Sequence, residues 1–247
     1  FRRPWGLPVR YHDWDGMTAL TNPTLLEIHL SYRDLELDGP TYFPEPLDLD
    51  LVVHAPELFA GDHLLDLTAP DDDYRSRSIA ELQRVVDLTR ALRPRFANAE
   101  APLIVVNVGG FSFDGPLEAA ERAVRRERLA ESLERIDEDG VELIPQTMPP
   151  FPWHMGGQRF HNLLVDDEEI TKFCAEHERR ICLDVSHSKL ACNHAGQSFD
   201  EFVRRVAPYT AHLHLADARG VDGEGIQVGE GGIDFGALAD ALNACPE

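Results

Sequence analysis

The sequence predicts an α/β fold in which parallel strands close into a TIM (β/α)8 barrel, with the last strand apparently missing from the chain. Three observations support this prediction. Short β-branched runs alternate with amphipathic stretches, which is typical of βα units and a parallel sheet. The length of 247 residues fits a single barrel domain. Polar side chains, many of them histidines, end one strand segment after another, and parallel barrels carry their active sites at those ends.

Seven segments have the composition of buried strands, and the eighth strand would begin where the chain stops. We therefore expect residues 1–247 to form one barrel domain that is excised from, or incomplete relative to, a longer chain. An open doubly wound sheet is the alternative, but such sheets usually carry a Gly-rich phosphate turn, and no GxGxxG is present. The predicted strands are 7–12, 25–31, 50–54, 102–108, 141–147, 181–186 and 211–216.

Five segments have helical periodicity, and their first residues suit helix starts. Ser78 suits an N-cap with Glu81 at the capping-box position, and Pro116 suits a first turn. Two long connections, 33–48 and 147–165, are rich in proline and aromatic residues; the second follows the fifth strand and is a candidate lid. The predicted helices are 78–93, 116–138, 166–178, 198–206 and 235–244.

The net charge of −21 argues against nucleic acids and anionic membranes as partners, because both attract basic surfaces. No apolar run is long enough to span a membrane, and no signal peptide is visible. The four cysteines form no CxxC pair, which favours a reducing compartment over a disulfide framework. We therefore expect a cytoplasmic protein.

Side chains alternate along a strand, so the last inward position of each strand can be assigned. The assignment places Cys182, Asp184 and Ser186 inside the barrel and turns Leu213 toward the helices. Carboxylates and imidazoles gathered at one end of a barrel suit a divalent cation. The polar strand ends are His12, His29, His54, Asn107, Gln146, Asp184 followed by His187, and His212 with His214.

Four motifs resemble the sugar phosphate isomerase/epimerase superfamily of xylose isomerase-like TIM barrels: VVHAPE (52–57), CLDVSHSKLAC (182–192), HLHLAD (212–217) and VGEGGIDF (228–235). That superfamily includes hexulose epimerases, inosose dehydratases and endonuclease IV-type enzymes. The PPFPWHMGG loop looks closest to a barrel domain fused to sialic acid synthase-type proteins. The endonuclease pattern fits less well, since Glu224 and Gln227 stand where that subgroup has an Asp-x-His pair.

The resemblance implies a divalent metal, Mn, Co, Zn or Mg, held by residues ending strands five to eight. Asp184 and His214 match the metal ligands of strands six and seven, and Gln146 stands where the family has a Glu on strand five. A Gln is a weak ligand and no general base, and the strand-eight Glu lies outside this sequence. His187, His54 and Gln146 are the expected catalytic residues.

The expected reaction is isomerisation or epimerisation of a sugar or sugar phosphate through an enediolate. The alternatives are a degenerate, non-catalytic sugar-binding or accessory domain, which Gln146 favours, and a dehydratase. The chain could form a homo-oligomer or part of a fused protein. The glycines of 228–235 are equally compatible with a plain turn and a phosphate cradle. The expected substrate-binding residues are His212, Asn107, Trp153, His154, Arg159 and Glu230.

Overall fold

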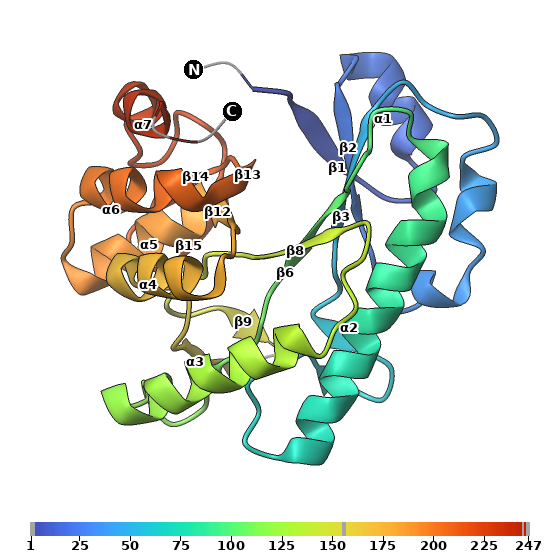
Figure 1. The fold of residues 1–247 in the computed structure, drawn as a ribbon. Coiled ribbons are helices and arrows are strands. Elements are labelled where there is room, and N and C mark those ends of the chain that lie inside the picture. The colour runs from blue at the N-terminus through green and yellow to red at the C-terminus, as the bar shows by residue number, and fades with distance from the viewer. Residues whose placement is uncertain (1–2, 155–156, 244, 246–247) are drawn as a thin grey trace.

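The computed structural model describes residues 3–154, 157–243 and 245, and it shows a TIM barrel fold with a central parallel sheet (Figure 1). Five strands pair in the order β1 (Gly6–Val9), β2 (Leu25–His29), β3 (Asp50–His54), β6 (Leu103–Val106) and β8 (Glu142–Pro145). The strands β12 (Ile181–Asp184) and β13 (Thr210–His214) form a further parallel pair. A bridge between Gln146 and Cys182 joins this pair to the end of β8, so the strands follow one another in chain order.

Helices cover the outer side of these strands (Figure 1). Short antiparallel strand pairs lie in the connections between the main strands and helices: β4–β5, β9–β10, β14–β15 and β7–β11. In the described residues, no helix is long and apolar enough to cross a membrane. The helices are α1 (Trp14–Thr21), α2 (Asp72–Leu92), α3 (Ala119–Glu134), α4 (Asp167–His177), α5 (Val185–Ala195), α6 (Phe199–Val206) and α7 (Phe235–Leu242). The short strands are β4 (Leu58–Phe59), β5 (His63–Leu64), β7 (Phe111–Ser112), β9 (Trp153–His154), β10 (Gly157–Gln158), β11 (Phe160–His161), β14 (Asp217–Arg219) and β15 (Gly223–Ile226); 3-10 turns span Asp34–Glu36, Gly39–Tyr42, Arg93–Arg95 and Ala207–Tyr209.

Side-chain caps decide where the helices begin, and they correct two predicted starts. Helix α2 begins six residues before Ser78, because Asp71 accepts a hydrogen bond from the Tyr74 amide at 2.8 Å. Ser78 is instead buried inside α2, where its hydroxyl accepts the Asp66 amide at 3.1 Å. Helix α3 begins at Ala119, so Pro116 precedes it.

Every predicted strand except β3 ends earlier than predicted, and two of these early ends displace residues that were expected to point inward. β12 stops at Asp184, because the Asp184 carboxylate accepts the His187 amide at 2.9 Å and starts helix α5 directly. Ser186, expected inside the barrel, therefore lies in α5, a helix that the sequence did not predict; nor did it predict α1. β1 stops at Val9, and the side chain of His12 is 80% exposed in the following turn. The expectation that His12 points inward is wrong.

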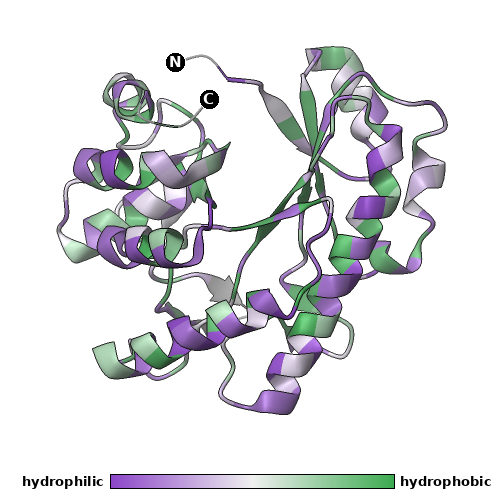
Figure 2. Ribbon diagram, in the orientation of Figure 1, coloured by the Kyte–Doolittle hydropathy of each residue, from purple (hydrophilic) through white to green (hydrophobic). Residues whose placement is uncertain are grey.

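Two apolar cores hold the barrel together. The larger core fills the space between the strands and the helices, and Leu183 and Leu213 belong to it, as the strand alternation predicts. In Figure 2 the central strands are largely green, whereas the helices carry both green and purple residues. The smaller core lies inside the barrel, one residue from each of five strands; we call it the apolar layer. It consists of Leu25, Val52, Val105, Ile144 and Cys182.

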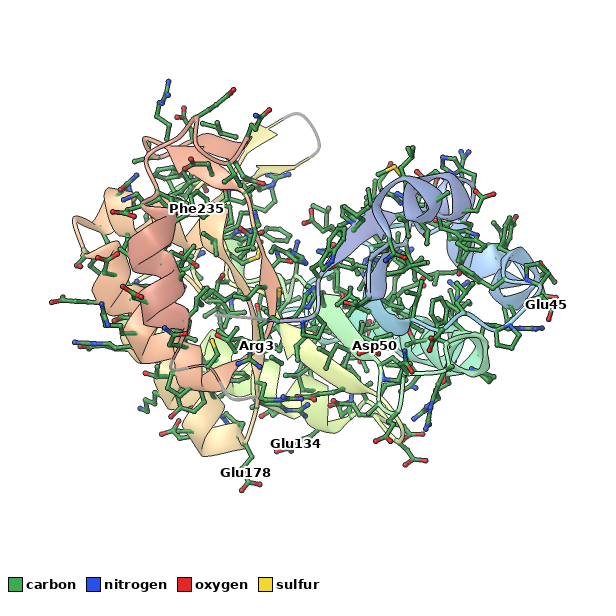
Figure 3. The ribbon with its side chains drawn as sticks, turned by 90° about the horizontal axis from the view of Figure 1, so that it is seen from above. Arg3, Glu45, Asp50, Glu134, Glu178 and Phe235 are labelled. Atoms are coloured by element: carbon green, nitrogen blue, oxygen red, sulfur yellow. The ribbon has the colours of Figure 1, made fainter. Side chains whose placement is uncertain are left out.

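The outer strands β1 and β13 face each other without pairing in the described part of the chain. A cavity of about 800 Å³ lies between them, and we call it the β1–β13 opening. The first and last described segments flank it, where the Arg3 guanidinium donates to the Cys245 carbonyl at 3.0 Å. Figure 3, seen from above, shows Arg3 between the two halves of the molecule. Glu27, His29 and His214 line the same opening.

Candidate functional site

A layer of polar side chains lies over the apolar layer, two residues further along the same strands. Because side chains alternate, each strand presents an apolar residue inside the barrel and then a polar one at its C-terminal end. This spacing takes Leu25 to Glu27 and Cys182 to Asp184. The polar layer consists of Glu27, His54, Asn107, Gln146 and Asp184, together with His214 on β13, which is the register partner of Asp184.

One carboxylate of this layer, that of Glu27, is surrounded by three histidines. The Nε2 atom of His29 lies 2.6 Å from Oε1, and the Nε2 atom of His212 lies 2.7 Å from Oε2. The Nε2 atom of His214 lies 3.0 Å from the same carboxylate. Glu27 is 5% exposed, so its charge requires these partners. We call these four residues the Glu27 cluster.

The contacts within the Glu27 cluster shift the pKa values of Glu27 and His214 toward their charged forms. Burial alone would raise the pKa of Glu27, but the hydrogen bonds from His212, His214 and His29 lower that pKa well below its ordinary value. Burial alone would lower the pKa of His214, but Cys182, Asp184 and Glu27 around it raise that pKa well above its ordinary value. The site therefore holds an ionised carboxylate in direct contact with imidazole nitrogens.

Gln146 lies between His54 and Asp184 in the polar layer. Its Oε1 atom lies 3.0 Å from Nε2 of His54, and its Nε2 atom donates to Oδ2 of Asp184 at 3.1 Å. The other ring nitrogen of His54 lies 3.0 Å from the Ala55 carbonyl oxygen. Burial and the nearby His29 lower the pKa of His54 to about 4, so its ring is neutral near pH 7. Gln146 therefore connects His54 to Asp184 but contributes no titratable group.

His187 forms the second cluster, in the first turn of α5. Its Nδ1 atom lies 2.9 Å from the Thr147 carbonyl oxygen and 3.7 Å from Oδ2 of Asp184, and its Nε2 atom lies 3.0 Å from Oε1 of Glu224. Burial would lower the pKa of His187, but Asp184 and Glu224 raise it to about 9. At neutral pH this ring is a cation that donates from both nitrogens. We call His187, Asp184 and Glu224 the His187 cluster.

Only some of the predicted substrate-binding residues lie in or beside the polar layer. Asn107 is buried at the end of β6 and donates to Glu57, while its side-chain carbonyl oxygen has no partner among the described residues. His212 belongs to the Glu27 cluster. The Arg159 guanidinium lies 3.7 Å from the Phe113 ring centroid, in a cation–π contact outside the polar layer. The side chains of Trp153 and His154 lie outside the described part of the structure.

The glycine-rich stretch that contains Glu230 is folded around a carboxylate of the protein itself. Asp217 accepts the amides of Gly229 at 3.0 Å, Gly231 at 2.8 Å and Ile233 at 3.0 Å. A Cβ at Gly231 would collide with this carboxylate, so only glycine fits. These amides are already paired, which favours the turn over the phosphate cradle, and Glu230 itself is exposed.

Sequence reasoning missed two carboxylates of the site. Glu27 shares the inward face with His29, and a charged residue inside the apolar run LLEIHL was the available signal. Glu224 reaches His187 because hairpin β14–β15 folds back onto α5, where the Ser186 hydroxyl accepts the Gly225 amide at 3.0 Å. That contact depends on an unpredicted helix, so no local signal identified Glu224.

Comparisons with known proteins agree with this architecture. A family model described as "Xylose isomerase-like TIM barrel" matches residues 15–245. No curated protein sequence matches the chain.

Solved structures show the same fold at low sequence identity. A "D-tagatose 3-epimerase-like protein" superposes with a TM-score of 0.72 and 18% identity, covering 98% of this chain and 86% of that one. A D-psicose 3-epimerase in the presence of D-fructose gives 0.60 and 14%, covering 98% and 81%. Endonuclease IV from Thermus thermophilus gives 0.58 and 17%, covering 98% and 90%. None of these three is a sialic acid synthase-type protein, so that closer assignment stays a prediction.

Proposed function

Because the chain belongs to the xylose isomerase-like TIM barrel family, we propose that it is a divalent-metal-dependent isomerase or epimerase of a sugar or sugar phosphate. The observation that carries this proposal is the His187 cluster, where a cationic imidazole and a half-exposed carboxylate lie 3.0 Å apart. Chemistry next to a carbonyl needs a base for the carbon-bound proton and a positive group for the enediolate oxygen. The cluster supplies both groups.

In this proposal His187 stabilises the oxyanion and Glu224 takes the proton. His187 is fixed by the Thr147 carbonyl and by Asp184, so its Nε2–H points along a defined direction. The side chain of Glu224 is 49% exposed, which leaves it accessible to a substrate. Glu224 thereby provides the base that Gln146 is unable to provide.

The polar layer and the structural relatives support a sugar as the substrate. The unpaired carbonyl oxygen of Asn107 is suited to accept a hydrogen bond from a sugar hydroxyl, since a buried acceptor without a partner costs stability. One relative is a psicose epimerase in the presence of fructose, which directs the first tests to ketohexoses and their phosphates.

A divalent cation would polarise the substrate carbonyl and lower the energy of the enediolate. The donor chemistry fits such an ion, because carboxylate and imidazole groups converge on His214. Asp184, His214 and Gln146 are the ligands that the family resemblance implies.

Solvent deuterium incorporation tests the proposal. Ketohexoses and their phosphates are incubated in D2O with the protein and Mn²⁺ or Co²⁺, and mass spectrometry detects deuterium on the carbon next to the carbonyl. We expect exchange with at least one sugar and a loss of about 100-fold or more in Glu224→Gln. Glu127→Gln, an exposed change on α3, is the matched control. Wild-type exchange in Glu224→Gln would refute the assigned base.

The hydrogen bonds of Gln146 favour a second candidate, a domain that binds sugar without turnover. Gln146 stands at a strand end where the family has a base, and both ends of its amide contact neighbouring side chains. Saturable sugar binding with no deuterium exchange would identify this case. A dehydratase would use the same enediolate and would reveal itself by loss of water from the sugar.

A further inference from the structure

We propose that Glu27, His54 and His214 hold the divalent cation, and that two imidazoles and one carboxylate favour an ion of borderline hardness such as Zn²⁺ or Co²⁺. In this arrangement Asp184 positions His214 instead of binding the ion. The inference deepens the proposed function and rests on it for the purpose of the cation, but its evidence is the geometry of the polar layer. It moves the carboxylate ligand from strands β8 and β12 to strand β2.

The three side chains already converge. One ligand atom from each lies within 4.8 Å of the others. His54 and His29 are register partners on neighbouring strands, which brings the β3 ligand beside β2. His214 reaches Glu27 from β13, at the far side of the β1–β13 opening. Zn–N and Zn–O bonds are about 2.0–2.2 Å long, so a small contraction of the three side chains would complete the site.

Each ring nitrogen of His54 faces an acceptor oxygen, but a neutral imidazole has only one N–H to donate. If Nδ1–H donates to the Ala55 carbonyl, the Nε2 lone pair faces the Gln146 Oε1 atom at 3.0 Å. Two lone pairs at this distance repel unless a positive centre lies beside both. A histidine whose Nδ1–H donates to a backbone carbonyl is the usual form of a metal ligand through Nε2. A cation beside Nε2 of His54 and Oε1 of Gln146 would remove this repulsion.

Glu27 is held in the manner of a metal-binding carboxylate. His29 contacts one of its oxygens and His212 the other, so the carboxylate has a fixed orientation. It is also deeply buried, and a buried carboxylate is stabilised by a cation in contact with it.

Asp184 differs from Glu27 in its donors, because its two oxygens accept amide N–H groups that have no lone pair to offer a cation, whereas the contacts of Glu27 are imidazoles. Oδ1 accepts the His187 amide at 2.9 Å, and Oδ2 accepts the Gln146 amide at 3.1 Å. Oδ2 also lies 3.5 Å from Nδ1 of His214, while Nε2 of His214 faces Glu27. A carboxylate on the far nitrogen of a ligating histidine is a common outer-sphere arrangement. Asp184 thus orients the ring whose other nitrogen would bind the ion.

A titration with Co²⁺ alone tests the site without any turnover. The full chain is titrated and its visible ligand-field absorption recorded, for the wild type, Glu27→Gln, His54→Gln, Asp184→Asn and the control Glu127→Gln. We expect Glu27→Gln and His54→Gln to weaken binding by more than the roughly 10–100-fold of an outer-sphere change, and to alter the spectrum. Asp184→Asn should weaken binding within that range and keep the wild-type spectrum, and the control should match the wild type.

Circular dichroism in the absence of metal checks that each variant is folded, and His54→Gln keeps the test decisive if Glu27→Gln is unfolded. The reverse pattern, with the spectrum lost in Asp184→Asn and kept in Glu27→Gln, would return the site to strands β8 and β12. A wild type that binds no Co²⁺, Zn²⁺ or Mn²⁺ would overturn the inference. Deuterium exchange by such a protein would still support isomerisation with Glu224 as the base while removing its metal dependence, so the two failures are distinguishable.

Discussion

The Glu27 cluster and the His187 cluster solve the same electrostatic problem in opposite ways. In the Glu27 cluster, one carboxylate is surrounded by three imidazoles. In the His187 cluster, one imidazole lies between two carboxylates, Asp184 and Glu224. Every member of the first cluster is on a strand, whereas the second draws on a helix and a surface hairpin.

This difference separates a rigid centre from an adjustable one. Strand β2, which carries Glu27, is buried from Leu25 to Ile28 and paired on both edges, so the carboxylate of the Glu27 cluster is held by the barrel itself. Glu224 is 49% exposed on β15, and its position depends on how hairpin β14–β15 folds. We therefore expect stability to depend mainly on the first cluster and proton transfer mainly on the second.

The largest expected effect comes from Glu27→Gln. Removing one partner of a buried ionic group leaves the others uncompensated, and we expect a loss of about 3 kcal/mol in the free energy of unfolding. Urea denaturation of the metal-free protein measures it, with Glu127→Gln as control. A loss below about 1 kcal/mol would show that the three imidazoles do not need the carboxylate, and would remove the contrast between the clusters.

The next effect concerns the hairpin that carries Glu224. In Asp217→Asn, the charge that accepts the amides of Gly229, Gly231 and Ile233 is lost. Hydrogen exchange of these amides should accelerate at least about tenfold, the loss expected from a hydrogen bond to a charged acceptor. The amides of β2 should keep their protection. Equal acceleration in both regions would mean that the two clusters unfold as one unit.

Glu224→Gln should lower the pKa of His187 from its value of about 9. A raised histidine pKa contributes stability that is complete below the unfolded value of 6.5 and is lost as pH rises through about 9. The variant should lose that contribution at lower pH, and because Glu224 is half-exposed the stability change should stay below about 1 kcal/mol. NMR titration of the His187 ring protons reports the pKa. An unchanged pKa would assign the shift to Asp184 alone.

The smallest effect is expected from His29→Gln. His29 is the most exposed histidine of the Glu27 cluster, and His212 and His214 still contact Glu27 when it is replaced. We expect a loss of about 0.5–1 kcal/mol, the net contribution of one hydrogen bond, in the same urea experiment. A loss as large as that of Glu27→Gln would indicate that His29, and not the carboxylate, organises the cluster.

Much of the fold was predictable because buried parallel strands have a strong sequence pattern. Val53, Val105 and Leu183 lie in continuous apolar runs, and each run became a strand within two or three residues of its expected limits. The exception, α5, begins with Val185 directly after the strand. A β-branched residue there extends the strand pattern, and only the Asp184 cap reveals the helix.

The candidate site was predictable in part, for a related reason. His54, Gln146 and His214 lie at strand ends, where alternation fixes their direction. Glu27 follows the same rule, but the sequence pattern predicts His29, two residues later, as the last inward residue of that strand. Glu224 depends on tertiary folding of a hairpin onto a helix, which no periodicity encodes. Which nitrogen of His214 faces Glu27 and which faces Asp184 is a property of packing, so the sequence alone could not distinguish the two carboxylates.

The junction of β12 and α5 has a consequence for the evolution of this chain. Asp184 is at once the last residue of the strand and the cap of the helix, with no loop residue between them. An insertion or deletion at this point would turn His187 to another side of the helix and uncap it in one event. We therefore expect insertions and deletions to be selected against at this junction. Across relatives, the distance from this aspartate to the histidine should stay constant even where the rest of the site is remodelled.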